Sequence, residues 1–325
     1  MKKKNFLRGK EQLGLLIGVV ALFVFMSIFA EGFFGWYNLH NLLKDTAVLL
    51  VVSTGMTLVI LIGKIDMSAG SVMSLTAIVT TILLASNVNV VLALLAGLLS
   101  GAIIGFINGY LIGIQKLDHF VTTFATLSLA KGLALVLCNG DIINTGSDSF
   151  KAIGDSKSVI LGIHVQIWIV MLIFIVMMVV LFKMKFGFKV FSIGGSEQAS
   201  SLAGIKTKTT YMKVFIISGV LASVGGILLA SKANNGNATI GTGFEFKAIA
   251  TVIIGGTPFD GGKGGLVGTL IGAFLISILQ NGLRFLGVTP SLQYVIIGLV
   301  ILAVIIVDVV INERRKHEEL RRVEQ

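Results

Sequence analysis

Long apolar runs alternate with short polar stretches along the 325 residues of this chain. A helix needs about 20 apolar residues to cross the hydrocarbon core of a membrane, and most of the runs approach that length. The pattern therefore predicts an all-α polytopic membrane bundle of about ten spans. The expected spans are 13–30, 46–65, 67–86, 90–114, 120–138, 165–182, 211–231, 246–257, 266–283 and 292–310.

Composition agrees with a membrane protein and excludes an ordinary soluble enzyme. The chain is 55% hydrophobic and 13% charged, whereas a soluble domain carries roughly 25% charged residues. A single cysteine excludes a disulfide framework and a cysteine zinc cluster, and the four histidines are scattered. We therefore expect no catalytic residue, no metal site and no cofactor bound by this chain.

Basic residues indicate how the spans are oriented. Sixteen of the 26 lysines and arginines lie in three clusters, near the start of the chain, in its middle and at its end. The positive-inside rule places all three clusters in the cytoplasm, with six spans before the middle cluster and four after it. The predicted cytoplasmic parts of this single permease domain, 1–325, are the segment 1–12, the loop 183–210 and the tail 312–325. The net charge of +10 is then a result of topology, and we expect no nucleic-acid binding.

Glycine is frequent inside the apolar runs. The chain has 39 glycines and two prolines. Gly101, Gly105 and Gly109 are spaced four apart, which places small residues on one helix face, as closely packed helices in lipid require. The first apolar run lacks the small residues that form a signal-peptide cleavage site, so it is interpreted as a retained helix and not as a cleaved signal peptide.

Few polar residues fall at membrane depth, and each is a candidate functional position because polar groups in lipid are costly. Asp66 and Ser68 lie in a very short connection, where they are predicted to cap the following helix, to take part in gating, or both. Glu245 opens the short eighth span, whose Gly/Pro-rich continuation is typical of the broken helices of transporters. The candidate translocation-pathway residues are Asp66, Ser68, Ser71, Asn108, Glu245 and Asn281, and for the asparagines a role in joining helices is an equal alternative.

The middle polar loop contains a helix start and a helix stop. Ser196 can cap a short helix, Glu197 suits its first turn, and Gly204 can end it. A helix of about two turns is therefore predicted there. An ordinary surface helix is one interpretation, and an element that transmits motion from a separate motor protein is the other.

Four segments of the chain resemble one family. Residues 63–71 resemble the GGIDLSVGS segment of permeases in bacterial ABC importers of the ribose, xylose and galactose class. Residues 193–205 resemble that family's IGGNxxAAxxxGI segment, 245–265 its ELxxIAAVVIGGTSLxGGxG stretch, and 105–109 its GLING. Three positions depart from the pattern: Lys64 replaces a glycine, Ser196 an asparagine and Ser200 an alanine.

The resemblance implies the membrane subunit of an importer for a monosaccharide in the bacterial inner membrane. It implies a partner ATPase that carries ATP and Mg, an extracytoplasmic sugar-binding protein, and a second permease chain, all within membrane lipid. It assigns contact with the ATPase to a coupling helix, with the candidate residues Gly195, Ser196, Glu197, Ala199 and Gly204.

Two other functions are weighed against this one. An ion-coupled secondary transporter needs ionisable groups near the middle of the membrane, whereas the acidic residues here are predicted mostly at the ends of spans. An intramembrane enzyme needs a nucleophile with a base, or a metal site, and the sequence has no such pattern.

Overall fold

Helices account for most of the chain. The computed structural model describes residues 2–155, 158–289, 291–293, 295–300, 302–303 and 306, and side chains from residue 13 onward. The helices are α1 (Lys2–Phe29), α2 (Trp36–Leu61), α3 (Ala69–Ala85), α4 (Val90–Gly113), α5 (His119–Cys138), α6 (Asp148–Gly154), α7 (Val165–Lys183), α8 (Lys185–Gly195), α9 (Glu197–Leu202), α10 (Thr207–Ala233), α11 (Phe244–Ile254) and α12 (Leu266–Phe285). The strands are β1 (Ile143–Asn144), β2 (Val159–Ile160), β3 (Ile163–His164) and β4 (Asn235–Gly236).

Among the described residues, six helices are long and apolar enough to cross a membrane: α2, α4, α5, α7, α10 and α12. Shorter apolar helices cover Leu13–Phe29, Ala69–Ala85 and Ser291–Val300. The total of ten spans and the side on which the termini lie stay predictions. The predicted tail 312–325 lies outside the described residues, as do the side chains of 1–12.

One predicted boundary is wrong by ten residues. The second span was expected to begin at residue 46, but α2 begins at Trp36. The residues before Thr46 include Asn38 and Lys44, which are polar and yet buried in the protein. The hydropathy pattern missed these ten residues because buried polar side chains lower the hydropathy as solvated ones do.

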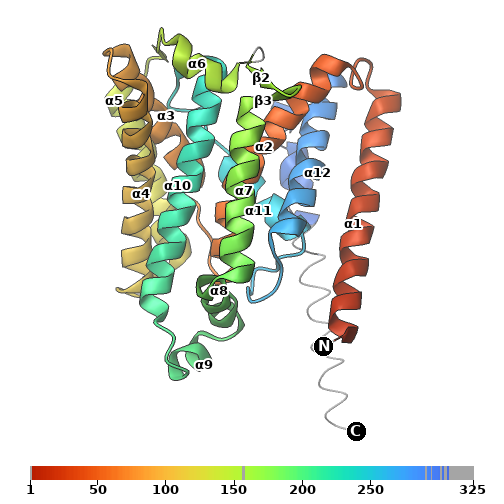
Figure 1. The fold of residues 1–325 in the computed structure, drawn as a ribbon, viewed down its shortest axis with the longest axis vertical. Coiled ribbons are helices and arrows are strands. Elements are labelled where there is room, and N and C mark those ends of the chain that lie inside the picture. Colours follow the sequence, from red (N-terminus) through yellow and green to blue (C-terminus); the bar gives the residue numbers. More distant parts are fainter. Residues whose placement is uncertain are drawn as a thin grey trace.

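The molecule has two ends with different structures (Figure 1). The strands and α6 lie at one end, and α8 and α9 lie at the other. At the strand end, β1 pairs antiparallel with β4, with Ile143 opposite Gly236. This pairing joins the connection between α5 and α6 to the connection between α10 and α11.

Glycines bring α4 and α10 into close contact, as their spacing predicted. A Cβ added to Gly105 would clash with the carbonyl oxygen of Phe215, and one added to Gly109 would clash with the backbone of Met212. A Cβ added to Gly101 would clash with the carbonyl oxygen of Gly219 and the Oγ of Ser223. The two backbones therefore form one tightly packed pair along their length.

This packing gives a testable prediction. Gly105→Ala is expected to destabilise the purified protein, because overpacking a close helix contact costs about 1–3 kcal/mol. Gly132→Ala in α5 is the matched control, since nothing lies within 4 Å of a Cβ placed there. Thermal unfolding of the two variants in detergent checks this. Equal midpoints would contradict the close contact between α4 and α10.

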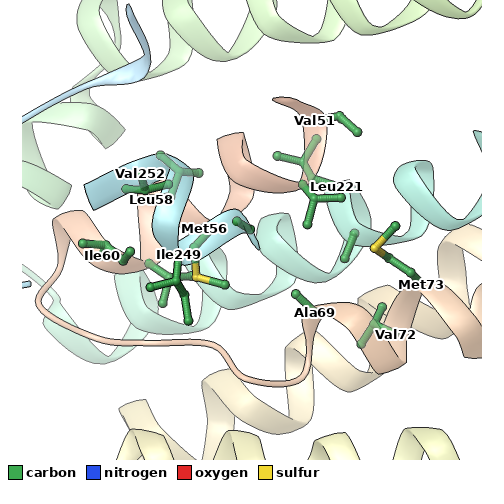
Figure 2. Close-up of a cluster of buried hydrophobic side chains, with 14 of the residues drawn as sticks. Val51, Met56, Leu58, Ile60, Ala69, Val72, Met73, Leu221, Ile249 and Val252 are labelled. Atoms are coloured by element: carbon green, nitrogen blue, oxygen red, sulfur yellow. The ribbon is translucent and has the colours of Figure 1, made fainter. Parts of the chain in front are cut away.

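Each half of the chain contains a long helix followed by a non-helical segment and a short helix. In the first half, α2 ends near α8, the chain continues without helix through residues 62–68, and α3 runs back (Figure 2). In the second half, α10 is followed by residues 234–243 and by α11, which has only 11 residues. The expected shortness of the helix at 246–257 is confirmed, with the bounds Phe244–Ile254. Gly241 packs directly on the backbone of Gly70, so the two interrupted regions meet inside the bundle, where non-helical backbone is shielded from lipid.

The core lies around these interrupted regions. Figure 2 shows Ile249 and Val252 of α11 beside Met56 and Leu58 of α2. All four side chains are buried. Apolar packing therefore fixes the short helix α11 against the long helix α2.

Candidate functional site

Helix α9 forms as its sequence predicted. The Oγ of Ser196 accepts a hydrogen bond from the backbone amide of Ala199, at 3.2 Å. Gly204 has a φ of +80°, and the amide of Ile205 donates to the carbonyl oxygen of Ser200 at 3.0 Å. This is the geometry in which a glycine ends a helix.

The segment before α9 differs from the prediction. It was expected to be loop, but Lys185–Gly195 forms α8, a second helix of 11 residues. Val190 and Ile193 face inward and are buried. Gly195 ends α8 just before the Ser196 cap. The predicted loop 183–210 is therefore largely helical, and its two short helices share the boundary at Ser196.

Helix α9 projects from the bundle at the end opposite the strands (Figure 1). Leu202 at its last position is 90% exposed. This side chain is therefore open to contact by another molecule.

Glu197 connects α9 to the bundle. Its Oε1 accepts from the Nζ of Lys116, at 2.6 Å, and its Oε2 accepts from the hydroxyl of Tyr211, at 2.8 Å. The Nζ of Lys116 and that of Lys64 lie 5.5 and 5.8 Å from the centroid of the Tyr211 ring. We call Lys64, Lys116, Glu197 and Tyr211 the α9 clamp. Sequence reasoning missed Lys116 and Tyr211, because they are far from Glu197 in the chain.

The clamp sets the charge of Glu197. Burial alone would raise the pKa of this carboxyl group, but the hydrogen bonds from Lys116 and Tyr211 outweigh burial and hold the pKa below its ordinary value. Because the pKa is lowered, the ionised Glu197 stabilises the folded arrangement fully above the ordinary carboxyl pKa. This stabilisation is lost as the pH falls through the lowered pKa. Glu197 is therefore ionised, and the clamp is intact, at neutral pH.

Asp66 lies in the non-helical segment between α2 and α3 and is 2% exposed. Its Oδ1 accepts from the backbone amide and the hydroxyl of Ser68, at 3.0 and 2.6 Å, and its Oδ2 accepts from the hydroxyl of Ser218, at 3.0 Å. The prediction that both residues cap α3 is wrong. Ser68 occupies the N-cap position without a capping side-chain bond, and Asp66 accepts from the amide of Ser68 and not from an amide of the helix. Among the described ion pairs, none joins Asp66 to a cation.

Further polar side chains extend this network into α4 and α5. The Nδ2 of Asn108 donates to the Oγ of Ser68 at 3.0 Å, and the hydroxyl of Thr126 donates to the Oδ1 of Asn108 at 2.7 Å. The amide of Ile65 donates to the Nδ1 of His119 at 3.3 Å. Three helices, α4, α5 and α10, thus hold the non-helical segment through hydrogen bonds. We call the bonded set the Asp66 network (Asp66, Ser68, Asn108, Thr126 and Ser218).

The structure brings together three of the six predicted pathway residues, Asp66, Ser68 and Asn108. The other three lie elsewhere. Asn281 exchanges two hydrogen bonds with Asn38, at 2.8 and 2.9 Å, which joins α2 to α12. Glu245 is buried against Gly70, and its Oε2 has no hydrogen-bond partner among the described residues. Ser71 is buried on α3.

The α9 clamp and the Asp66 network are both attached to α10. Tyr211 and Ser218 are seven residues apart, which places them on the same face of this helix. Lys116 follows α4, which carries Asn108 and is packed tightly against α10. The surface helix and the buried network are therefore connected through one rigid helix pair.

Comparison with known proteins decides the family. The family described as "Branched-chain amino acid transport system / permease component" matches residues 38–305. The chain belongs to this permease family.

Its relatives include three proteins of Escherichia coli K12. The ribose import permease protein RbsC is 36% identical over 297 residues, which cover 90% of this chain and 92% of RbsC. The probable ABC transporter permease protein YphD is 35% identical, over 93% of this chain and 91% of its own length. The L-arabinose transport system permease protein AraH is 30% identical, over 94% and 93%. No solved structure matches the chain.

These matches confirm the predicted resemblance to permeases of monosaccharide importers. The chain is a permease component, and it is a multi-pass protein of the inner membrane.

Proposed function

We propose that this chain is the membrane subunit of an ATP-binding cassette importer and moves a monosaccharide of the ribose or arabinose kind into the cell. The observation that carries the proposal is α9, a capped helix with an exposed Leu202 that projects from the bundle and is clamped to it through Glu197. A permease of this class binds no ATP itself. It needs a partner ATPase, an extracytoplasmic sugar-binding protein and a second permease chain.

The relatives favour a sugar over an amino acid. The family description refers to branched-chain amino acids, but RbsC and AraH, which match nearly the whole chain, are named for ribose and L-arabinose. The name of YphD refers to an ABC transporter, which favours an ATP-driven importer over an ion-coupled secondary transporter.

In the proposed mechanism, α9 receives motion from the ATPase and passes it to the interior. Gly195, Ser196, Glu197, Ala199 and Gly204 form and end the helix that docks on the ATPase. Displacement of α9 pulls on Lys116 and Tyr211, and therefore on the packed pair of α4 and α10. Because Ser218 and Asn108 lie on that pair, the movement reaches Asp66 and the non-helical segment 62–68. A change in the hydrogen bonds of this segment then alters the translocation pathway between the helices.

Uptake by the reconstituted complex tests the function. Proteoliposomes that contain this chain and its ATPase, with ATP inside and the binding protein outside, are given labelled D-ribose or L-arabinose. We expect uptake that requires internal ATP and that a protonophore leaves unchanged. Uptake driven by a proton or sodium gradient without ATP would contradict the proposal.

The α9 clamp gives a separate prediction. Glu197→Lys is expected to lower uptake while ATP hydrolysis continues, because Lys116 then repels α9. The double variant Glu197→Lys, Lys116→Glu restores opposite charges and is expected to recover part of the uptake. Both side chains are more than a third exposed, so the pair contributes only about 0–1 kcal/mol to stability. The ratio of sugar moved to ATP hydrolysed is therefore the measurement, and an unchanged ratio in Glu197→Lys would count against the clamp.

A further inference from the structure

A second polar region lies apart from the Asp66 network, in a cavity of about 330 Å³ between α2, α10, α11, α12 and the helical stretch 291–300. Its volume is at the lower end of the range for small-molecule sites. The lining residues are Asp45, Val48, Leu49, Leu229, Phe244, Lys247, Ser277, Gln280, Arg284, Gln293 and Ile297. Six of the eleven are polar or charged, which is costly within a membrane bundle unless water or a ligand meets them.

The polar residues converge because of helical spacing. Ser277, Gln280 and Arg284 are separated by three and four residues, so they share one face of α12. Phe244 and Lys247 share a face of α11 in the same way. Sequence reasoning missed this site because Asp45 was taken to precede the second span, whereas it lies inside α2.

An ion pair crosses one side of the cavity. The carboxylate of Asp45 accepts from the Nζ of Lys232 at 2.6 Å and from the Nη2 of Arg284 at 3.1 Å. This arrangement links α2, α10 and α12. The carboxylate keeps unused lone pairs, and the guanidinium of Arg284 keeps further N–H donors.

Other groups offer unused hydrogen-bonding capacity. The Nε2 of Gln280 is buried and has no partner among the described residues. The side-chain Nε2 of Gln293 donates to the carbonyl oxygen of Val288 at 2.8 Å, which leaves the side-chain oxygen of Gln293 as an acceptor. The Nζ of Lys247 lies 4.8 Å from the centroid of the Phe244 ring.

We propose that this cavity binds a neutral polyhydroxylated solute the size of a monosaccharide. Each hydroxyl group of such a solute donates one hydrogen bond and accepts others, so it can pair with the donors Gln280 and Lys247 and with the acceptors Asp45 and Gln293. The apolar wall, which includes the Phe244 ring, fits the C–H faces of the solute. The wall carries one negative side chain, Asp45, and two positive ones, Arg284 and Lys247, so an anionic ligand is the alternative that competition with D-gluconate tests. The identity of the solute rests on the proposed function, whereas the existence of the site does not.

Direct binding to the permease–ATPase complex without the binding protein tests the site. Labelled D-ribose is the probe, L-arabinose and D-gluconate are the competitors, and bound label is measured by scintillation proximity. We expect D-ribose to bind and L-arabinose to displace it. Gln280→Leu removes a buried donor at similar size and is expected to weaken binding about tenfold, as the loss of one good hydrogen bond does.

Two further variants make the result interpretable. Ser277→Ala is expected to weaken binding several-fold, and Ser128→Ala, an exposed serine of α5, serves as the control with wild-type binding. Equal affinity in all variants, or displacement by D-gluconate and not by L-arabinose, would overturn the assignment. Failure of the wild-type complex to bind sugar while the full system still imports it would overturn this site and leave the proposed function standing.

Discussion

Gly204→Val is expected to abolish ATP-coupled uptake while the protein still inserts and folds. Gly204 has a φ of +80°, a conformation that costs an L-residue roughly 1–2 kcal/mol and is least tolerated by a β-branched one. The stop of α9 would then move, and Leu202 would leave its position. Since no atom lies within 4 Å of a Cβ at Gly204, the change leaves the packing of the bundle intact. Uptake and ATP hydrolysis in proteoliposomes measure the effect.

Gly204→Asn is the matched control, because asparagine tolerates positive φ better than other residues with side chains. It is expected to retain most of the uptake. Normal uptake by Gly204→Val would remove α9 from the mechanism. Equal loss in both variants would show that the open space beside Gly204, and not its backbone conformation, is what the partner requires.

Asp66→Ala is expected to have the second large effect, on both stability and uptake. The substitution leaves the amide and hydroxyl of Ser68 and the hydroxyl of Ser218 without their acceptor. A buried donor that loses its partner costs about 1–3 kcal/mol. Thermal unfolding should show a lower midpoint than in the wild type, and uptake should be lost.

Asp66→Asn separates hydrogen bonding from charge. Its carboxamide oxygen can accept from Ser68, and its nitrogen can donate to the Ser218 hydroxyl, so stability should be close to that of the wild type. Uptake by Asp66→Asn then shows whether transport needs the negative charge of the carboxylate. A normal unfolding midpoint in Asp66→Ala would contradict the Asp66 network.

Features encoded in neighbouring residues could be predicted from the sequence. The Ser196 cap and the Gly204 stop are local, and both form as expected. The glycine spacing of α4 predicted close packing, and the short apolar run after Glu245, with its Gly/Pro-rich continuation, predicted a short helix.

Features that depend on residues distant in the chain could not be predicted. Glu197 pairs with Lys116, 81 positions away, and Asp66 accepts a hydrogen bond from Ser218, 152 positions away. No periodicity indicates such pairs. Hydropathy also placed the start of α2 too late, because a buried polar side chain has the same sequence signal as a solvated one.

Site-specific photocrosslinking tests the central claim most directly. A photoreactive residue is placed at Leu202 on α9 or at Leu161 in the opposite end of the molecule, positions that are 90% and 88% exposed. Captured proteins from native membranes are identified by mass spectrometry. The account predicts that position 202 captures a protein with a Walker ATP-binding motif and that position 161 does not. Capture of that ATPase from position 161 alone, or from neither position under efficient crosslinking, would contradict it.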